Sequence, residues 1–246
     1  MKVSKLISGV FILYVLLVIP ALASETEKQT NTYKGVSELD VSNVTGDIEL
    51  SSWDKDYVEV TYVKKAEDEE KLDDIIVDIN QKGNLLTIDT DMPRNCRRCN
   101  VTYTISIPMD FSYLEANTVT GDVYARNLGI VQKFEAKSTT GDIDANLSGE
   151  SFKLNVVTGD IDLRIDKISK PGKIAIETIT GSVNVSVPEK FSSDIYLSTI
   201  TGSVRTNFEL DKTNIKKKNK LEGVVGDGKG DCNITAITGS IDLRMK

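Results

Sequence analysis

The sequence predicts an all-β fold, a parallel β-solenoid, and two observations carry this prediction. The tripeptide Thr-Gly-Asp or Thr-Gly-Ser occurs seven times, and apolar residues alternate with polar ones on both sides of it. Four successive intervals between its glycines are 20, 18, 22 and 21 residues, which is typical of a stacked supersecondary unit. Each unit, or coil, is expected to hydrogen-bond to the next and to bury its inward residues in continuous columns. The seven glycines are Gly46, Gly121, Gly141, Gly159, Gly181, Gly202 and Gly239.

Apolar residues occupy fixed positions relative to each glycine. The residues seven and five before it, and two after it, are apolar in all seven repeats, as expected for half-buried strands. The position two before it is apolar in six repeats, and we expect it to continue the alternation of the position two after. This stretch is out of phase by one residue with the apolar positions seven and five before the glycine. The change of phase predicts a bend or bulge just upstream of the Thr-Gly pair, with the glycine pointing inward or lying where neighbouring coils crowd. The residues two before the glycine are Val44, Val119, Thr139, Val157, Ile179, Ile200 and Ile237.

The long first interval predicts a structured insertion before the regular coils. The expected elements are strands within 37–63, one short charged helix at 66–72, a hairpin at 74–90 and an alternating strand at 100–108. We therefore divide the mature chain into an N-terminal β region at 24–110, which holds the first coil and the insertion, and regular solenoid coils at 111–246.

The first 23 residues have the three parts of a secretory signal. Lys2 and Lys5 form a basic start, residues 6–19 an apolar run, and Ala21-Leu22-Ala23 a small-residue cleavage pattern. We expect cleavage there, and an exported protein in the extracellular space, at the cell surface or in the periplasm. The alternative is an uncleaved membrane anchor, because the apolar stretch is at the lower limit of a spanning helix.

Composition and charge exclude several classes of function. The 246 residues contain no histidine, which excludes a Ser-His-Asp triad, a His general base and a His-ligated metal site. Removing two signal lysines changes the formal charge from -7 to -9, since -7 - 2 = -9. Such an acidic domain is not expected to bind nucleic acid, and it would meet a membrane only through an uncleaved N-terminus.

Three cysteines fit an oxidising compartment. Cys96 and Cys99 lie in a loop between expected strands, which predicts a local disulfide. A redox motif would need a helix N-terminus after the first cysteine, and the strand residues that follow do not supply one. Cys232 occupies the apolar column seven before the last glycine and is expected to be a buried thiol.

Several features together resemble the bacterial and archaeal extracytoplasmic family labelled "putative adhesin", domain of unknown function 4097. They are the seven Thr-Gly-Asp/Ser turns, YTISIP at 103–108, Val187-Pro188 after the fifth turn and GDGKG at 226–230. The resemblance covers residues 34–246. It implies a single-stranded, right-handed β-helix at the cell surface, with adhesion suggested by the label, and it brings no catalytic residues. The chain departs from the family pattern in the serine that replaces aspartate in the last three turns and in the Cys-Arg-Arg-Cys segment.

The threonines and aspartates that flank the glycines are the candidate binding residues. Stacked coils would place them in outward ladders, with two further aspartates on the same face. Carboxylates about 4.8 Å apart repel unless they are compensated, and calcium prefers oxygen ligands, so one interpretation is calcium at Asp142 and Asp160. The other is that the aspartates cap backbone N–H groups, which serine can also do. The candidates are Thr120, Thr140, Thr158, Asp122, Asp142, Asp160, Asp144 and Asp162.

These features favour a non-catalytic exported protein that binds a surface glycan, an envelope polymer or a protein through many regularly spaced contacts. No catalytic residue is expected, because the aspartates recur with the repeat whereas catalysis needs one distinct pocket. The alternative is a structural or sensory envelope component whose protein partner recognises the inserted hairpin region or the lysine-rich loop at 212–220. A third interpretation is a polysaccharide-active β-helix enzyme that uses paired aspartates.

Overall fold

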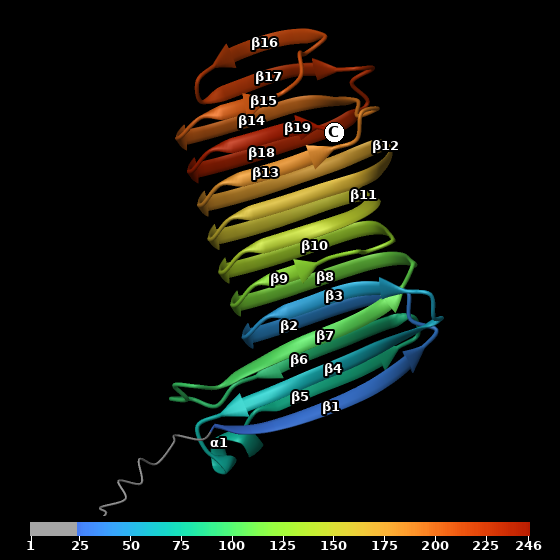
Figure 1. The fold of residues 1–246 in the computed structure, drawn as a ribbon, viewed down its shortest axis with the longest axis vertical. Coiled ribbons are helices and arrows are strands. Elements are labelled where there is room, and N and C mark those ends of the chain that lie inside the picture. Colours follow the sequence, from blue (N-terminus) through green and yellow to red (C-terminus); the bar gives the residue numbers. More distant parts are fainter. Residues whose placement is uncertain (1–23) are drawn as a thin grey trace, which may run out of the picture.

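The computed structural model describes residues 24–246, and the expected signal segment at 1–23 lies outside them. The described chain is all-β with one short helix, as predicted, and its strands form one large mixed sheet. Figure 1 shows the strands stacked along one long axis. In chain order the elements are β1 (Glu25–Lys34), β2 (Glu38–Thr45), β3 (Ile48–Trp53), β4 (Tyr57–Ala66), α1 (Glu69–Asp73), β5 (Ile76–Lys82), β6 (Leu85–Asp91), β7 (Asn100–Pro108), β8 (Asp110–Thr120), β9 (Val123–Ala125), β10 (Ile130–Thr140), β11 (Ile143–Thr158), β12 (Ile161–Thr180), β13 (Val183–Val187), β14 (Ser193–Thr201), β15 (Val204–Thr206), β16 (Lys212–Lys217), β17 (Lys220–Val225), β18 (Gly230–Thr238) and β19 (Ile241–Met245).

Each repeat forms a coil of two strand segments joined by its Thr-Gly-Asp/Ser turn. Equivalent segments of neighbouring coils pair in parallel and in register, so that Thr140 of β10 lies between Thr120 of β8 and Thr158 of β11. The segments before the turns form one layer, the long-strand layer, of β2, β8, β10, the end of β11, the end of β12, β18 and β14. The segments after the turns form the facing short-strand layer of β3, β9, the start of β11, the start of β12, β13, β19 and β15. β11 and β12 are long because each runs through both layers.

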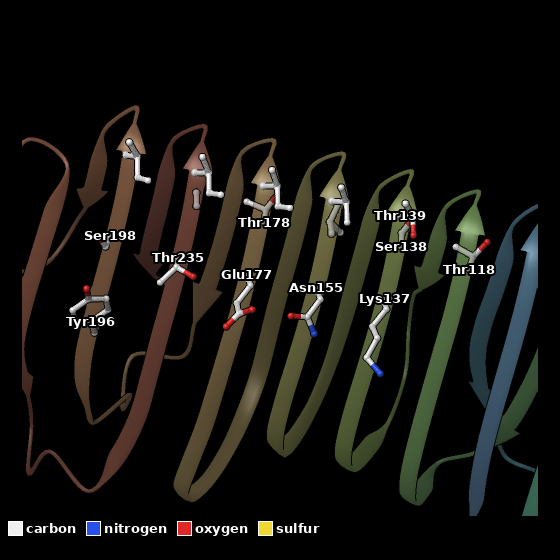
Figure 2. A pocket seen from close by; sticks show the side chains of 16 residues that line it. Thr118, Lys137, Ser138, Thr139, Asn155, Glu177, Thr178, Tyr196, Ser198 and Thr235 are labelled. Atoms are coloured by element: carbon white, nitrogen blue, oxygen red, sulfur yellow. The ribbon is translucent and has the colours of Figure 1, made fainter.

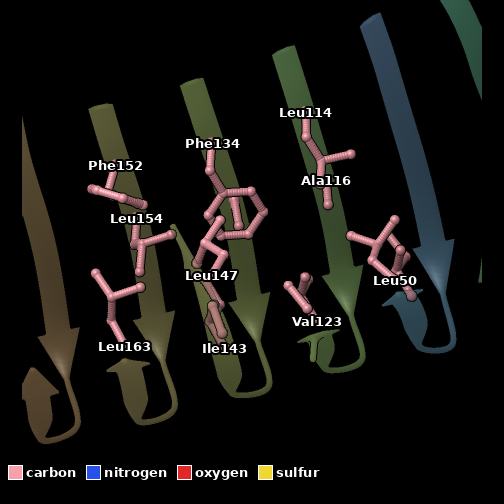
Figure 3. Packing of buried hydrophobic residues seen from close by; sticks show 14 of the residues in the cluster. Leu50, Leu114, Ala116, Val123, Phe134, Ile143, Leu147, Phe152, Leu154 and Leu163 are labelled. Carbon is pink, nitrogen blue, oxygen red and sulfur yellow. The ribbon is translucent and has the colours of Figure 1, made fainter. Parts of the chain in front are cut away.

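The core lies between the two layers. The residues seven and five before each glycine are buried in every coil, as the alternation predicts. Figure 3 shows Phe134 and Phe152 at the same height in adjacent coils, above Ile143 and Leu163 of the facing layer. One coil alone could not cover such side chains on both sides, whereas the stacked coils bury them in a single cluster that runs from Val36 to Leu243.

The predicted position of the phase change is wrong. The strand register stays unshifted up to the threonine, and the residue three before the glycine points inward, so the apolar residue after it points outward. Thr118 is 5% exposed, whereas Val119 is 50% exposed. In three coils this inward position holds a hydroxyl that donates to the glycine carbonyl of a neighbouring coil, as Ser138 does to Gly121 at 3.1 Å. Val156 and Ala236 are buried at the same position without a hydroxyl, so the unbroken alternation of the strand sets the orientation. The phase therefore changes inside the turn, and the apolar residues two before the glycine form an exposed column.

The coils also do not stack in chain order. The last coil in the chain, β18 and β19, lies between the coil of β12 and β13 and the coil of β14 and β15. The backbone N–H of Gly181 donates to Thr238 at 2.9 Å, and that of Gly239 donates to Thr201 at 2.8 Å. The chain therefore passes over one coil position and returns to fill it.

Antiparallel strands close both ends of the stack, so the sheet is mixed and not wholly parallel. At one end the insertion supplies β6 and β7, which extend β2 and β3 in parallel, and β5, β4 and β1, which add antiparallel strands. At the other end β17 pairs with β14 and β16 pairs with β17, both antiparallel. The edge strand β16 is rich in lysine, which disfavours pairing with another sheet edge.

The predicted elements of the insertion are present. The hairpin of β5 and β6 turns at Gly83 and Asn84, and β7 covers the predicted alternating strand. The helix begins later than predicted, because Asp68 caps it by accepting a 2.8 Å hydrogen bond from the Lys71 N–H. Leu72 is the buried residue of this helix. Between residues 24 and 246, no helix has the length and apolar character needed to cross a membrane.

The cysteines fall into two environments. Cys96 and Cys99 form a disulfide in the loop between β6 and β7, with their Cα atoms 5.6 Å apart. Cys232 is free and fully buried between Ile174 and Ile195 of the neighbouring coils, and this burial raises the pKa of its thiol.

Candidate functional site

The Thr-Gly-Asp/Ser turns form one edge of the stack. The predicted binding threonines, Thr120, Thr140 and Thr158, lie there in register and exposed. Between coils, the glycine N–H donates to the next threonine carbonyl, as Gly141 does to Thr158 at 3.0 Å. Gly159 has φ +144°, and a Cβ there would lie 2.2 Å from the Gly141 carbonyl oxygen. The glycine is thus required because neighbouring coils crowd, one of the two predicted reasons.

The turn aspartates cap the backbone of the next coil. Asp122 Oδ1 accepts from the Asp142 N–H at 2.8 Å, and Asp142 Oδ1 accepts from the Asp160 N–H at 2.7 Å. In the same way, Asp160 Oδ1 accepts a hydrogen bond from the Ser182 N–H at 2.7 Å. Each cap bridges two coils and satisfies a backbone donor that the sheet ladder leaves unpaired.

Capping occupies one oxygen of Asp142 and one of Asp160. Among residues 24–246, no cluster of three or more acidic, Cys or His side chains could hold a metal ion. A calcium ion at these aspartates would therefore take most of its six to eight oxygen ligands from water or from a bound ligand.

A polar groove crosses the outer surface of the short-strand layer. Asp144 and Asp162 pair in register there, and Asn184 and Asp242 continue the same row on β13 and β19. Two adjoining hollows, with volumes of about 50 and 360 Å³, share Asp162 and Asn184 in their walls. The groove comprises Asp144, Asp162, Arg164, Asn184, Ser186, Asp242 and Arg244.

Hydrogen bonds hold the groove side chains in place. Arg126 donates to Asp144 Oδ2 through Nε at 2.8 Å and through Nη2 at 2.6 Å. Arg244 donates to Asp242 through two hydrogen bonds, from Nε to Oδ1 at 2.9 Å and from Nη2 to Oδ2 at 2.6 Å. Asn184 Nδ2 donates to Asp162 Oδ1 at 2.9 Å. These pairs are exposed and add little to stability, but they orient acceptors and donors before any ligand arrives.

An aromatic side chain lies beside the groove, on the coil before Asp144. The Arg126 guanidinium lies 4.3 Å from the centre of the Tyr124 ring. The Tyr124 hydroxyl donates to Asp122 Oδ2 at 2.7 Å, and this hydrogen bond, with burial, raises the pKa of Tyr124 to about 12.

The structure thus separates the eight candidate residues into two groups. Six lie at the turn edge, three of them capping aspartates, whereas Asp144 and Asp162 belong to the polar groove. Sequence reasoning missed Asn184, Asp242 and Arg244, although they occupy the positions three and five after their glycines. The spacing of three that placed Asp144 also fits Asn184 and Asp242, and Arg244 lies two residues further along on the same face of its strand.

Comparison with known proteins agrees with this architecture. A family model described as Toastrack DUF4097 matches residues 28–244. A crystal structure of a "putative cell adhesion protein" from Clostridium sporogenes is similar, with 16% identity, a TM-score of 0.52, and coverage of 90% of this chain and 100% of that chain. A "putative adhesin" from Bacteroides fragilis has 13% identity and a TM-score of 0.39, and covers 89% of this chain and 97% of its own. No curated protein matches the chain. Because the family model covers nearly all of the described coils, this chain belongs to the toastrack DUF4097 family.

Proposed function

We propose that the protein is an exported, non-catalytic, adhesin-like protein whose polar groove binds an extended, hydroxyl-rich polymer such as a surface glycan. The observation that carries this proposal is the row of Asp144, Asp162, Asn184 and Asp242, in register across four coils. Coils repeat at about 4.8 Å, so a polymer that runs along the stack would meet similar polar groups at each step. Many weak, evenly spaced contacts suit adhesion through multivalency.

The chemistry of the groove favours sugar hydroxyls over apolar ligands. Carboxylate and amide oxygens accept hydrogen bonds from hydroxyl groups, and guanidinium groups donate to them. Because Asp144, Asp162 and Asp242 are already oriented by Arg126, Asn184 and Arg244, little side-chain entropy is lost on binding.

A non-catalytic role is supported by how the carboxylates are used. The turn aspartates serve as backbone caps at equivalent places in successive coils, and the groove aspartates are paired with cations or amides. A glycosidase needs two carboxylates that differ in environment, one of them protonated. The description of the similar Clostridium structure as a "putative cell adhesion protein" is in keeping with a binding role.

The proposal is tested by co-sedimentation of residues 24–246 with isolated cell envelopes and with insoluble polysaccharides. The groove variant Asp144→Asn/Asp162→Asn should lower binding by about tenfold or more, since it removes two charged acceptors. The matched variant Asp142→Asn/Asp160→Asn keeps a cap oxygen at both turns and should bind like the original protein.

Three results would contradict the proposal. Failure of the unaltered protein to pellet with any envelope or polysaccharide would exclude a glycan ligand of this kind. Full binding by the groove variant would exclude the groove. Binding that is lost with a calcium chelator and with the turn variant, but kept by the groove variant, would move the site to the turn edge.

A structural or sensory role with a protein partner is the second candidate, and the hairpin of β16 and β17 favours it. This hairpin ends the stack (Figure 1). Its edge strand β16 exposes Lys212, Lys216 and Lys217. An acidic protein segment would fit such a surface. Charge reversal, Lys216→Glu/Lys217→Glu, should release a co-purifying partner if this candidate is right, whereas a retained partner would reject it.

A further inference from the structure

The outer surface of the long-strand layer carries an apolar patch that the proposed glycan site does not use. The structure has nine large hydrophobic side chains that are exposed among residues 24–246, and five of them line one groove on this surface. Ile200 is 73% exposed, the highest value in the group. Exposed apolar groups gathered in this way mark interaction surfaces. The five are Val157, Ile179, Tyr196, Ile200 and Ile237.

The groove has a volume of about 650 Å³ and runs across the coils. Figure 2 shows a row of polar side chains along it, with Lys137, Asn155 and Glu177 on three successive strands. The hydroxyl of Thr178, in the groove lining, is buried and has no hydrogen-bond partner within the described chain. We call this surface, with its apolar column and polar row, the long-strand face.

Two opposite charges on the long-strand face lie symmetrically about Asn155. Asn155 lies in register between Lys137 of β10 and Glu177 of β12. A two-fold axis parallel to β11 and passing beside Asn155 would therefore place Lys137 of one copy opposite Glu177 of another, and form the same pair again by symmetry. Both side chains are exposed, and Glu177 has no ion-pair partner in residues 24–246. A self-complementary patch is what an isologous dimer requires.

We propose that a second copy of this chain binds the long-strand face about this two-fold axis. The apolar column then matches itself in reverse order of coils: Val157 meets Val157, Val119 meets Ile237, and Thr139 meets Ile179. Because this pairing joins apolar side chains at nearly every coil, it removes the exposed column from water.

The area of the face is sufficient for a specific dimer. Seven coils about 4.8 Å apart and three outward positions about 6.6 Å apart give roughly 600 Å² per copy, or about 1,200 Å² in total. This is the lower end of specific interfaces, so the dimer should form in a concentration-dependent way.

The inference goes beyond the proposed glycan function and does not depend on it. The polar groove lies on the opposite layer, so it stays open in both copies of the dimer. Two grooves on one particle would strengthen binding to a polymer without any new contact.

Sedimentation velocity of residues 24–246, from low micromolar concentration to several hundred micromolar, tests the proposal. Glu177→Lys places Lys137 of each copy opposite a second lysine and should weaken self-association about tenfold or more. Lys137→Glu should have the same effect through like negative charges. An equimolar mixture of the two variants pairs opposite charges at both positions and should restore a heterodimer.

The controls separate association from folding. Lys137 also donates to Glu115 at 2.9 Å, so the fold of Lys137→Glu is checked by thermal unfolding, while Glu177→Lys carries no such complication. Ile179→Lys should abolish the dimer. The matched variant Ile76→Lys alters an exposed apolar residue of β5, away from the groove, and should leave the dimer intact.

Each of the other outcomes overturns the inference. A protein that remains monomeric at the highest concentration excludes the second copy as the occupant of the face. A dimer that tolerates Glu177→Lys and Ile179→Lys lies elsewhere on the molecule. A dimer that both charge reversals break, but that their mixture does not restore, has a different symmetry axis.

Discussion

Asp142 Oδ1 accepts a 2.7 Å hydrogen bond from the backbone N–H of Asp160, one coil further along the stack. The bond links two coils through a side chain, at a turn where the parallel ladder is interrupted. An unmet backbone donor costs about 1–3 kcal/mol when it is buried, and less at this exposed edge. The main role of the repeated aspartate is therefore to stabilise the contact between neighbouring coils.

Replacement of this cap should show which chemical group the turn needs. Asp142→Ala leaves the Asp160 N–H without its partner and should lower the free energy of unfolding by about 1 kcal/mol. Asp142→Asn keeps an oxygen acceptor and should lose less than half of that. Urea unfolding followed by circular dichroism measures both, and equal losses for the two variants would show that charge, not capping, matters.

Gly159→Ala should be far more destabilising than an ordinary surface change. The new Cβ would meet the Gly141 carbonyl oxygen at 2.2 Å, and φ +144° is unfavourable for alanine, so we expect a loss of about 3 kcal/mol or more.

Gly83→Ala is the matched control for this glycine. Gly83 also has a positive φ, +64°, but no atom lies within 4 Å of a Cβ placed there. Its substitution should cost only about 1 kcal/mol, the penalty of the backbone conformation. Similar losses for the two variants in denaturant unfolding would argue against crowding between coils.

Acid should remove stability through Glu115. Burial opposes ionisation of this carboxyl, but hydrogen bonds from Tyr113, Lys137 and Asn117 outweigh it and lower its pKa from 4.5 to about 2. A carboxyl with a lowered pKa stabilises the folded state above its unfolded pKa, and this contribution is lost as the pH falls. We expect the loss between pH 4.5 and about 2. Its size should be about 2 kcal/mol or less, below what the full pKa difference implies, because solvent screens this partly exposed carboxyl.

Glu115→Gln isolates this contribution from that of other carboxyls. The variant cannot ionise at this position, so it should be less stable at neutral pH, and the difference from the original protein should shrink below pH 4.5. Thermal unfolding across this pH range measures the difference. A difference that is constant with pH would exclude a lowered pKa at Glu115.

The Cys232 thiol should be unreactive in the folded protein. It is buried, and burial raises its pKa, so little thiolate forms and reagents cannot reach it. Ellman's reagent should label it only after denaturation. Cys232→Val should be tolerated within about 1.5 kcal/mol, whereas Cys232→Asp should prevent folding, because the aspartate would be a buried charge without a partner. Rapid labelling of the native protein would show that the coil opens.

The sequence determined the coil, because the pattern inside each coil is local. The inward columns that hold Leu114 and Phe134, the turns at glycine and the hairpin at Gly83 all follow from alternation and turn chemistry over a few residues. The sequence also predicts, as one of two interpretations, that Asp142 caps a backbone N–H, since a short acidic side chain in a turn has few backbone partners within reach.

Only the tertiary structure decided which coils are neighbours and which way Val119 points. All coils share one register, so the alternation around Cys232 fits between Ile174 and Ile195 as well as it would fit after Ile195, and long-range pairing made the choice. Val119 faces water because the alternation that buries Leu114 and Ala116 continues to Thr118 without a shift. The inward Thr118 hydroxyl donates to the carbonyl of Gly46, a group that is distant in sequence and adjacent only once the coils stack. Partners of this kind have no local signal, since the contacts that select them form between segments far apart in the chain.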